Sequence, residues 1–174
     1  MAEGDKFMVM TLISLPIKTL DGEFWAHYSE KGLAELNFPK AERKSPVTAS
    51  TPTTISKPVR DWHKLTEAAL KNILDGKKPK AYPPLDWAGT AFQKSVWKVM
   101  LEIPAGKTKS YGEVAAAIGR PKAVRAVGSA CGANPIPVLV PCHRILAANN
   151  KLGGFGSGLG WKSRLLEAEG VFPS

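Results

Sequence analysis

The pattern of hydrophobic and polar residues divides the chain into two dissimilar halves. The first half opens with two β-rich runs, Phe7 to Leu15 and Gly22 to Tyr28, and a third run over residues 32–38 alternates imperfectly, as many strands do. Asp21-Gly22 suits a turn between the first two runs. These runs predict a small antiparallel sheet.

The polar stretch between Lys40 and Pro58, rich in Ser, Thr and Pro, predicts a long loop. Helical spacing of apolar residues resumes over residues 61–75. Residues 76–84 combine Gly, Lys and Pro and form the clearest linker in the sequence. We therefore place a domain boundary near residue 86, with a supporting domain over 1–86 and a second domain over 87–174.

Helix starts are explicit in the second half. Thr90 followed by Gln93 is a capping box, and an apolar face repeats at helical intervals from there to Pro104. Ser110 with Glu113 is a second capping box. It predicts a short helix from Tyr111 to Ile118, which Gly119 ends.

A third helix is expected from Pro121, a residue suited to the first helical turn, to about Gly132. Two short helices joined by a glycine-bearing turn indicate a helix-turn-helix. The predicted fold class is α+β: a small antiparallel-sheet and helix domain, then a mostly helical domain with a winged-helix-like DNA-binding motif. The third helix is lined with small residues, which suits either entry into a groove or tight packing in a core.

Charge changes this picture. The chain has 174 residues, of which 44% are hydrophobic, and a net charge of +9. Residues 89–164 hold eleven Lys or Arg against two acids, whereas the remaining charges cancel. A basic domain beside a neutral one suggests a polyanionic partner. A general solubility surface is the alternative.

There are two cysteines, Cys131 and Cys142, with no metal-ligand spacing between them. We interpret both as reduced thiols in a reducing compartment, with Cys131 in packing or groove contact. The run from Phe7 to Leu15 is too short to span a membrane and lacks a cleavage-like ending. We therefore expect a soluble, intracellular protein.

Cys142 and His143 place a thiol next to a base. The aliphatic, proline-containing segment 134–140 should run extended and deliver Cys142 to the interior. Neighbouring side chains diverge, so direct contact between the two is not expected. A bridging water or a local bend would connect them, and a further group would hold the imidazole. These two residues alone leave a packed core thiol open as the alternative.

Five signals then fall in register: Tyr111-Gly112, Arg125 to Gly128, Asn134-Pro135, Pro141 to Arg144 and Leu165 to Gly170. In this order and spacing they resemble the O6-alkylguanine-DNA alkyltransferases. The resemblance covers residues 89–171, and the first half is similar only loosely. It implies stoichiometric, suicidal transfer of the alkyl group from O6-alkylguanine in duplex DNA to a cysteine, with O4-alkylthymine as a second candidate substrate.

The resemblance also implies residue roles. Cys142 matches the alkyl acceptor, His143 the water-mediated base, and Glu169 the carboxylate on the other ring nitrogen. Tyr111 matches the donor to the departing guanine, and Asn134 the hinge that ties the recognition helix to the active-site segment.

Further roles concern DNA and the base. Arg125 matches the arginine finger that fills the space of the rotated nucleotide. The DNA-binding set implied is Arg125, Ala126, Gly128, Ser110 and Gly132, and the substrate pocket implied is Pro137, Ile145, Phe155 and Gly156.

One departure concerns the pocket. The family commonly has an aromatic-Ser-Gly-Gly pattern, whereas this chain has Phe155-Gly156-Ser157-Gly158, which puts the tolerance of bulky alkyl groups in question. Some relatives bind zinc in the first domain. Here that domain has no cysteine and only His27 and His63, so we expect no structural zinc and no cofactor.

The expected partner is double-stranded DNA containing O6-alkylguanine, bound by a monomer that could act cooperatively, with no membrane involved. The expected compartment is the cytoplasm of a bacterium or archaeon, or the nucleus of a eukaryote. Two other functions compete. Alkyltransferase-like proteins bind alkylated DNA but lack the acceptor cysteine, against which Cys142 argues. A cysteine hydrolase would use the same Cys, His and acid but leaves the helix-turn-helix unexplained.

Overall fold

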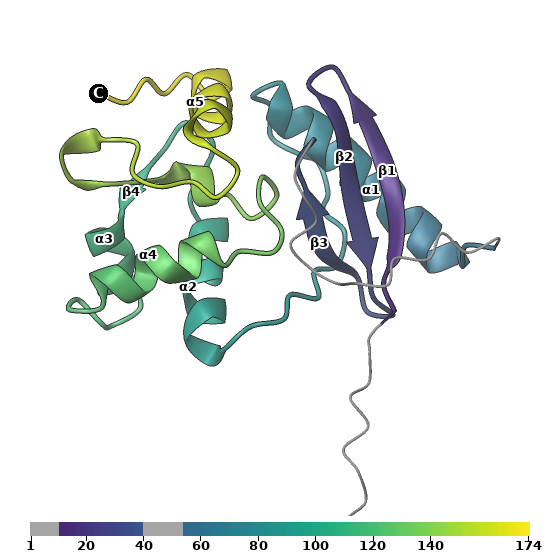
Figure 1. The fold of residues 1–174 in the computed structure, drawn as a ribbon, viewed down its shortest axis with the longest axis horizontal. Helices are drawn as coiled ribbons and strands as arrows, with labels where there is room; N and C mark the ends of the chain where they lie inside the picture. The colour runs from purple at the N-terminus through teal and green to yellow at the C-terminus, as the bar shows by residue number, and fades with distance from the viewer. Residues whose placement is uncertain (1–10, 40–53) are drawn as a thin grey trace, which may run out of the picture.

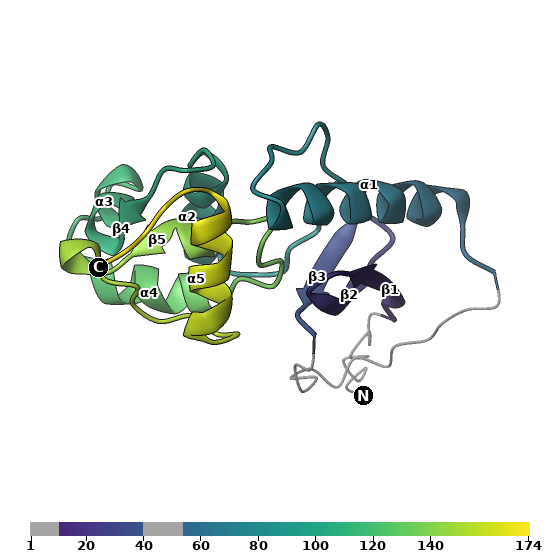
Figure 2. The same ribbon diagram turned by 90° about the horizontal axis from the view of Figure 1, so that it is seen from above.

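The structure is a computed structural model that describes residues 11–39 and 54–174 of the chain. The described residues form two lobes that lie side by side (Figures 1 and 2). The first lobe holds an antiparallel sheet and one long helix, and the second is mostly helical. The α+β class predicted from the sequence is confirmed.

The sheet has three strands in the order β1 (Ile13–Thr19), β2 (Gly22–Tyr28) and β3 (Leu33–Asn37). The position predicted for the first strand is wrong, since it runs to Thr19 instead of ending at Leu15, and residues 7–10 lie outside the described part. Ile17 is buried whereas Pro16 and Lys18 are exposed, so the period of two continues past Leu15. Pro16 is tolerated because β1 is an edge strand.

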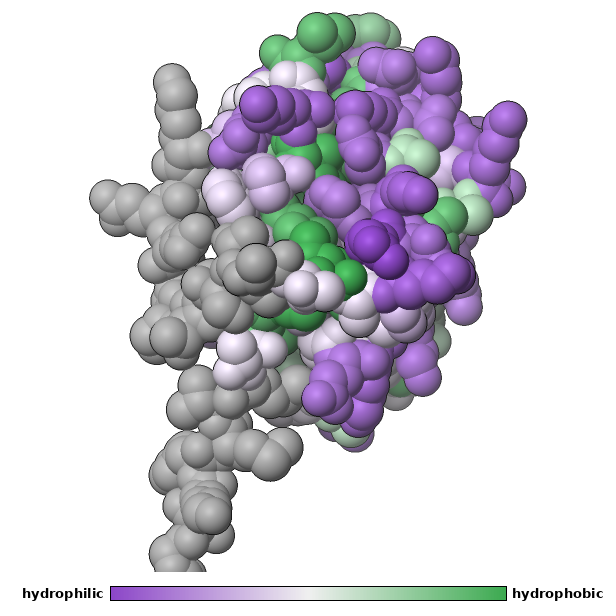
Figure 3. Space-filling model, turned by 90° about the vertical axis from the view of Figure 1, so that its right-hand side faces the viewer, coloured by the Kyte–Doolittle hydropathy of each residue, from purple (hydrophilic) through white to green (hydrophobic). Residues whose placement is uncertain are grey.

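Helix α1 (Lys57–Leu74) covers one face of the sheet (Figure 2). It begins four residues before the predicted start, because Pro58 fits the first helical turn. Of the predicted loop between Lys40 and Pro58, residues 40–53 lie outside the described part. On the side of α1 and β1, hydrophilic side chains surround a narrow hydrophobic band (Figure 3).

Both predicted capping boxes are present. Thr90 caps α2 (Ala91–Leu101) with Gln93, and Ser110 caps α3 (Tyr111–Ala117) with Glu113; in each pair the two side chains accept from each other's backbone N–H. Gly119, which follows α3, has the left-handed φ of 72° that ends a helix.

Helix α4 (Val124–Gly132) starts three residues later than predicted. Pro121 lies in a separate turn, closed by a hydrogen bond from the N–H of Ala123 to the carbonyl of Arg120 (2.9 Å). The N-cap residue Ala123 supplies no side-chain cap, so no local sequence signal marks this start.

The remaining elements are two short strands, two 3₁₀ turns and the last helix. They are β4 (Lys109–Ser110), which pairs in parallel with β5 (Ile145–Leu146), the 3₁₀ turns η1 (Cys142–Arg144) and η2 (Ala148–Asn150), and α5 (Leu159–Ala168).

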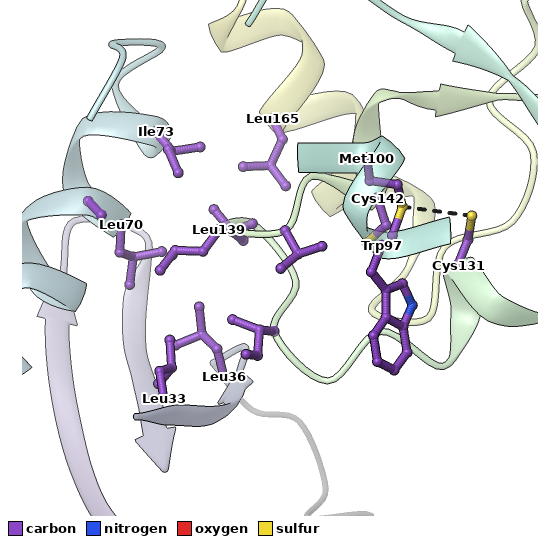
Figure 4. Packing of buried hydrophobic residues seen from close by; sticks show 14 of the residues in the cluster. Leu33, Leu36, Leu70, Ile73, Trp97, Met100, Cys131, Leu139, Cys142 and Leu165 are labelled. Carbon is purple, nitrogen blue, oxygen red and sulfur yellow. Dashed lines mark hydrogen bonds between the residues drawn. The ribbon is translucent and has the colours of Figure 1, made fainter. Parts of the chain in front are cut away.

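One hydrophobic cluster runs through both lobes. Leu36 of β3 and Leu70 of α1 face Leu139 and Leu165 of the second lobe (Figure 4). The cluster continues to the region of Cys142. The domain boundary near residue 86 stays a prediction, and the first lobe packs directly against the segment that carries the candidate nucleophile.

Candidate active site

A closed loop over residues 134–140 leads into Cys142. Asn134 donates through Nδ2 to the carbonyl of Val140 (2.8 Å) and accepts at Oδ1 from the N–H of Ile136 (3.0 Å). Val138 has a φ of 74°, which costs a β-branched residue roughly 1–3 kcal/mol. The prediction of an extended segment is therefore wrong, because the Asn134 side chain closes the loop and the surrounding core holds it.

Cys142 is the first residue of η1. Its N–H donates to the carbonyl of Val140 (2.8 Å), and the residue is 8% exposed. Burial raises the pKa of the thiol, while the Asn134 amide and the Lys162 ammonium act in the opposite direction. The resting thiol is thus protonated and has to lose its proton before it can act as a nucleophile.

His143 is fully buried and held from one side. Its Nε2 lies 2.9 Å from Oε1 of Glu169, whereas Nδ1 is buried without a hydrogen-bond partner among the described residues. Burial lowers the pKa of the imidazole against the opposing effect of Glu169. An ionised carboxylate only accepts, so we assign the ring proton to Nε2. Nδ1 then carries a free lone pair, which can accept a proton.

Glu169 is the centre of a buried network. Besides His143, its carboxylate accepts from Nε (3.0 and 3.1 Å) and Nη2 (2.8 Å) of Arg144 and from the N–H of Gly106 (3.1 Å). Burial would raise the pKa of the carboxyl, but the hydrogen bonds from His143 and Arg144 lower it to about 2. Arg144 is anchored in turn by the carbonyl of Ile103 (2.6 Å). The carboxylate therefore stays charged and fixed in place.

Lys162 of α5 is a lysine with no exposed surface. Its Nζ donates to the carbonyl of Ile145 (2.6 Å) and, at 3.4 Å, to that of Gly154. Burial lowers the pKa of the ammonium, while the thiols of Cys142 and Cys131 raise it. The side chain thus joins two backbone segments and brings positive charge toward the thiols.

Tyr111, the first residue of α3, is half-buried between two glycines. A Cβ built on Gly153 would lie 3.1 Å from its Oη, and one on Gly128 of α4 would lie 3.9 Å from its ring. Burial raises the pKa of the phenol, and the neighbouring Cys131 and Cys142 raise it further. The phenol remains protonated and can donate.

The comparisons with known proteins agree on one family. A family model for the DNA-binding domain of 6-O-methylguanine DNA methyltransferase matches residues 91–171. The methylated-DNA–protein-cysteine methyltransferase of Methanosarcina mazei is 44% identical over 140 residues, which are 80% of this chain and 85% of that protein. The chain belongs to the methylated-DNA–protein-cysteine methyltransferase family.

Solved structures of the family have the same fold. The O6-methylguanine methyltransferase of Mycobacterium tuberculosis is 34% identical with a TM-score of 0.74, over 94% of this chain and 96% of that chain. The M. tuberculosis protein in complex with DNA is 37% identical with a TM-score of 0.72, over 88% and 90%.

In this member of the family, the residues predicted to contact DNA lie on α4 or at the start of α3. Arg125, Ala126 and Gly132 are exposed, and Gly128 is half-buried against Tyr111. The Ser110 side chain is engaged in its capping box. The opposite side of α4, including Cys131, is buried in the core.

The predicted pocket residues are less uniform. Ile145 is fully buried, Pro137 and Phe155 are half-buried, and Gly156 is exposed. A hollow of about 480 Å³ opens beside Tyr111, lined by residues 108–113, 124 and 146–150. It borders Tyr111 and does not include Cys142.

Sequence reasoning assigned no role to Arg144 or Lys162, although both are buried and both touch the site. For Arg144 the available signal was a charged residue next to the apolar Ile145 and Leu146, which needs a partner when buried; the sequence around Lys162 offers no such signal. Within residues 11–39 and 54–174, no three His, Cys, Asp or Glu side chains are grouped to hold a metal ion. No helix in these ranges is both long and apolar enough to cross a membrane.

Proposed function

We propose that the chain repairs duplex DNA by transferring the alkyl group of O6-alkylguanine to Sγ of Cys142, with O4-alkylthymine as a second candidate substrate. The observation that carries this proposal is the buried, unpaired Nδ1 of His143 in the residue next to the thiol, with Nε2 held by Glu169. A structural histidine would be expected to satisfy both ring nitrogens.

In the proposed reaction, Nδ1 of His143 accepts the Cys142 proton through a bridging water. Glu169 stabilises the imidazolium that forms. The thiolate attacks the alkyl carbon, the S–C bond forms, and the C–O bond breaks with its electron pair moving to the guanine. Tyr111 donates a hydrogen bond or proton to the guanine, where negative charge develops.

The proposed product is a thioether on Cys142. Unlike the thioester of a cysteine hydrolase, a carbon–sulfur single bond has no carbonyl that water can attack. The thiol is therefore not regenerated, and each molecule acts once.

The second part of the proposal concerns DNA. Helices α3 and α4 would act as a helix-turn-helix with α4 in the minor groove, where small residues such as Ala126 permit close approach. Arg125 is exposed on α4 and would fill the space of the rotated nucleotide. Lys109 and the polar Asn149 and Asn150 line the hollow beside Tyr111 and suit a phosphate of the bound strand.

A duplex with one radiolabelled methyl on O6 of guanine tests the proposal. We expect label to move to the protein and to stop at one equivalent. Binding without transfer would favour a binding-only protein. Absence of both binding and transfer would favour a cysteine hydrolase. Cys142→Ala should abolish transfer and keep DNA binding. Cys131→Ser is the matched control because burial raises the pKa of Cys131 to about 12, so its thiol is not expected to compete for the methyl.

A further inference from the structure

The C-terminal end of β3, in the first lobe, contacts a wall of the proposed pocket through the backbone. The N–H of Leu36 donates to the carbonyl of Pro135 (2.9 Å). Pro135 belongs to the loop that Asn134 closes and that carries Pro137, one of the predicted pocket residues. The first lobe thus holds the loop that would form one wall of the proposed pocket.

Two residues further along, the side chain of Phe38 reaches Phe155, another of the predicted pocket residues. Phe38 is 4% exposed, and its ring lies 6.0 Å from that of Phe155 in an edge-to-face arrangement of 82°. It also contacts Trp161 of α5, with 4.8 Å between ring centroids. Such aromatic pairs stabilise their arrangement beyond the burial of the rings. Phe155 is thereby packed against the first lobe.

The rest of the Phe155 loop is held by the second lobe at its first residues. Gly153 lies against Tyr111, and Gly154 accepts from Lys162. After Phe155 the chain turns into α5, with the N–H of Gly158 donating to the carbonyl of Phe155 (3.0 Å), and a Cβ built on Gly156 would meet nothing within 4 Å. The ring of Phe155 itself makes its aromatic contact with Phe38.

We propose that the end of β3 sets the width of the alkyl-group pocket, with Phe38 as the positioning residue that holds Phe155. This inference rests on the proposed function and assigns the selection of alkyl-group size to the first lobe. The aromatic contacts of Phe38 are with Phe24, Phe155 and Trp161. Phe38 acts by preventing the Phe155 wall from receding, so a smaller side chain in its place widens the pocket.

The test uses Phe38→Leu, with Phe24→Leu as the matched control. Phe24 is a fully buried residue of the same aromatic cluster, and its ring contacts are with Phe38 and Trp161 instead of Phe155. Single-turnover rates are measured on duplexes that differ only in carrying O6-methylguanine or O6-butylguanine. Phe38→Leu should raise the butyl-to-methyl rate ratio at least fivefold, and Phe24→Leu should change it less than twofold.

A double-mutant cycle separates positioning from general destabilisation. Phe155→Leu should raise the ratio by itself, and adding Phe38→Leu to it should change the ratio no further. An unchanged or lowered ratio in Phe38→Leu, an equal change in Phe24→Leu, or additive effects in the double variant would overturn the inference. If Phe38→Leu does not fold, a ratio unchanged by Phe155→Leu alone overturns it.

The same experiment distinguishes this inference from the proposed function. A wild-type protein that transfers no methyl to Cys142 contradicts the proposed function, and the inference falls with it. If the wild-type protein transfers methyl to Cys142 but Phe38→Leu leaves the butyl-to-methyl rate ratio unchanged, only the inference is overturned.

Discussion

Replacing Glu169 with Gln is expected to destabilise the fold strongly while changing the shape of the side chain little. The carboxylate is 1% exposed and shared by His143, Arg144 and the N–H of Gly106. A pKa lowered from 4.5 to about 2 corresponds to about 3 kcal/mol of stabilisation. Removing one partner of a buried ion pair costs about 3–5 kcal/mol, which agrees with that figure.

The pH dependence gives the sign of the effect. Because the folded-state pKa of Glu169 lies below its unfolded value, its contribution is complete above pH 4.5 and is lost as the pH falls from 4.5 toward 2. Burial also lowers the pKa of His143, so acidification below 6.5 destabilises the fold through this group as well. Urea unfolding of wild type and Glu169→Gln at several pH values measures both effects.

We expect a loss of about 3–5 kcal/mol at pH 7 for Glu169→Gln and a difference from wild type that shrinks below pH 4.5. Glu167→Gln is the control: Glu167 is exposed in the last turn of α5, which Glu169 follows directly, and the variant should stay within about 0.5 kcal/mol of wild type. A loss below about 1 kcal/mol at pH 7, or one that does not depend on pH, would refute the reasoning.

Three further outcomes are expected. Arg125→Ala should slow transfer from duplex DNA far more than transfer from free alkylated base, measured by label on the protein; equal losses would argue against base rotation. Gly153→Ala, at a φ of 67° and with its Cβ 3.1 Å from Oη of Tyr111, should displace the phenol and slow transfer at least tenfold at unchanged duplex affinity; an unaltered rate would contradict that placement. Lys162→Met should raise the pKa of Cys142 further, so the pH–rate profile of thiol alkylation should move to higher pH; a profile that stays in place would exclude an electrostatic effect of the ammonium.

The sequence predicted the features that depend on local signals. The capping boxes at Thr90 and Ser110 define the starts of α2 and α3, because each satisfies its N–H groups with residues three positions away. The start of α4 has no such cap at Ala123, and its predicted position was wrong by three residues.

The shape of the active-site loop depends on contacts that no local pattern encodes. The apolar, proline-containing segment after Asn134 favours extended structure. The amide of Asn134 instead closes it over six residues, and burial in the core stabilises the unfavourable φ of Val138. The sequence shows the prolines and Asn134, but it does not show the two hydrogen bonds by which the Asn134 amide closes the loop.

Among the site residues, too, local sequence signals do not show contacts between distant parts of the chain. The His143–Glu169 contact was implied by resemblance to a family, since the two residues are separated by 26 positions. Arg144 stands in the same motif but received no role, because its partners Glu169 and Ile103 come from distant parts of the chain. A buried lysine such as Lys162 needs tertiary structure to be found, because lysine is usually exposed.

Locating the transferred methyl group on the protein tests the central claim most directly. Cleavage after Arg125 and Arg144 releases one peptide that holds both Cys131 and Cys142, so fragmentation between the two thiols has to assign the site. After exposure to a duplex containing O6-methylguanine, the account predicts one methyl group per molecule, on Cys142 alone. Methyl on Cys131, or an unmodified peptide after the lesion has disappeared from the DNA, would contradict it.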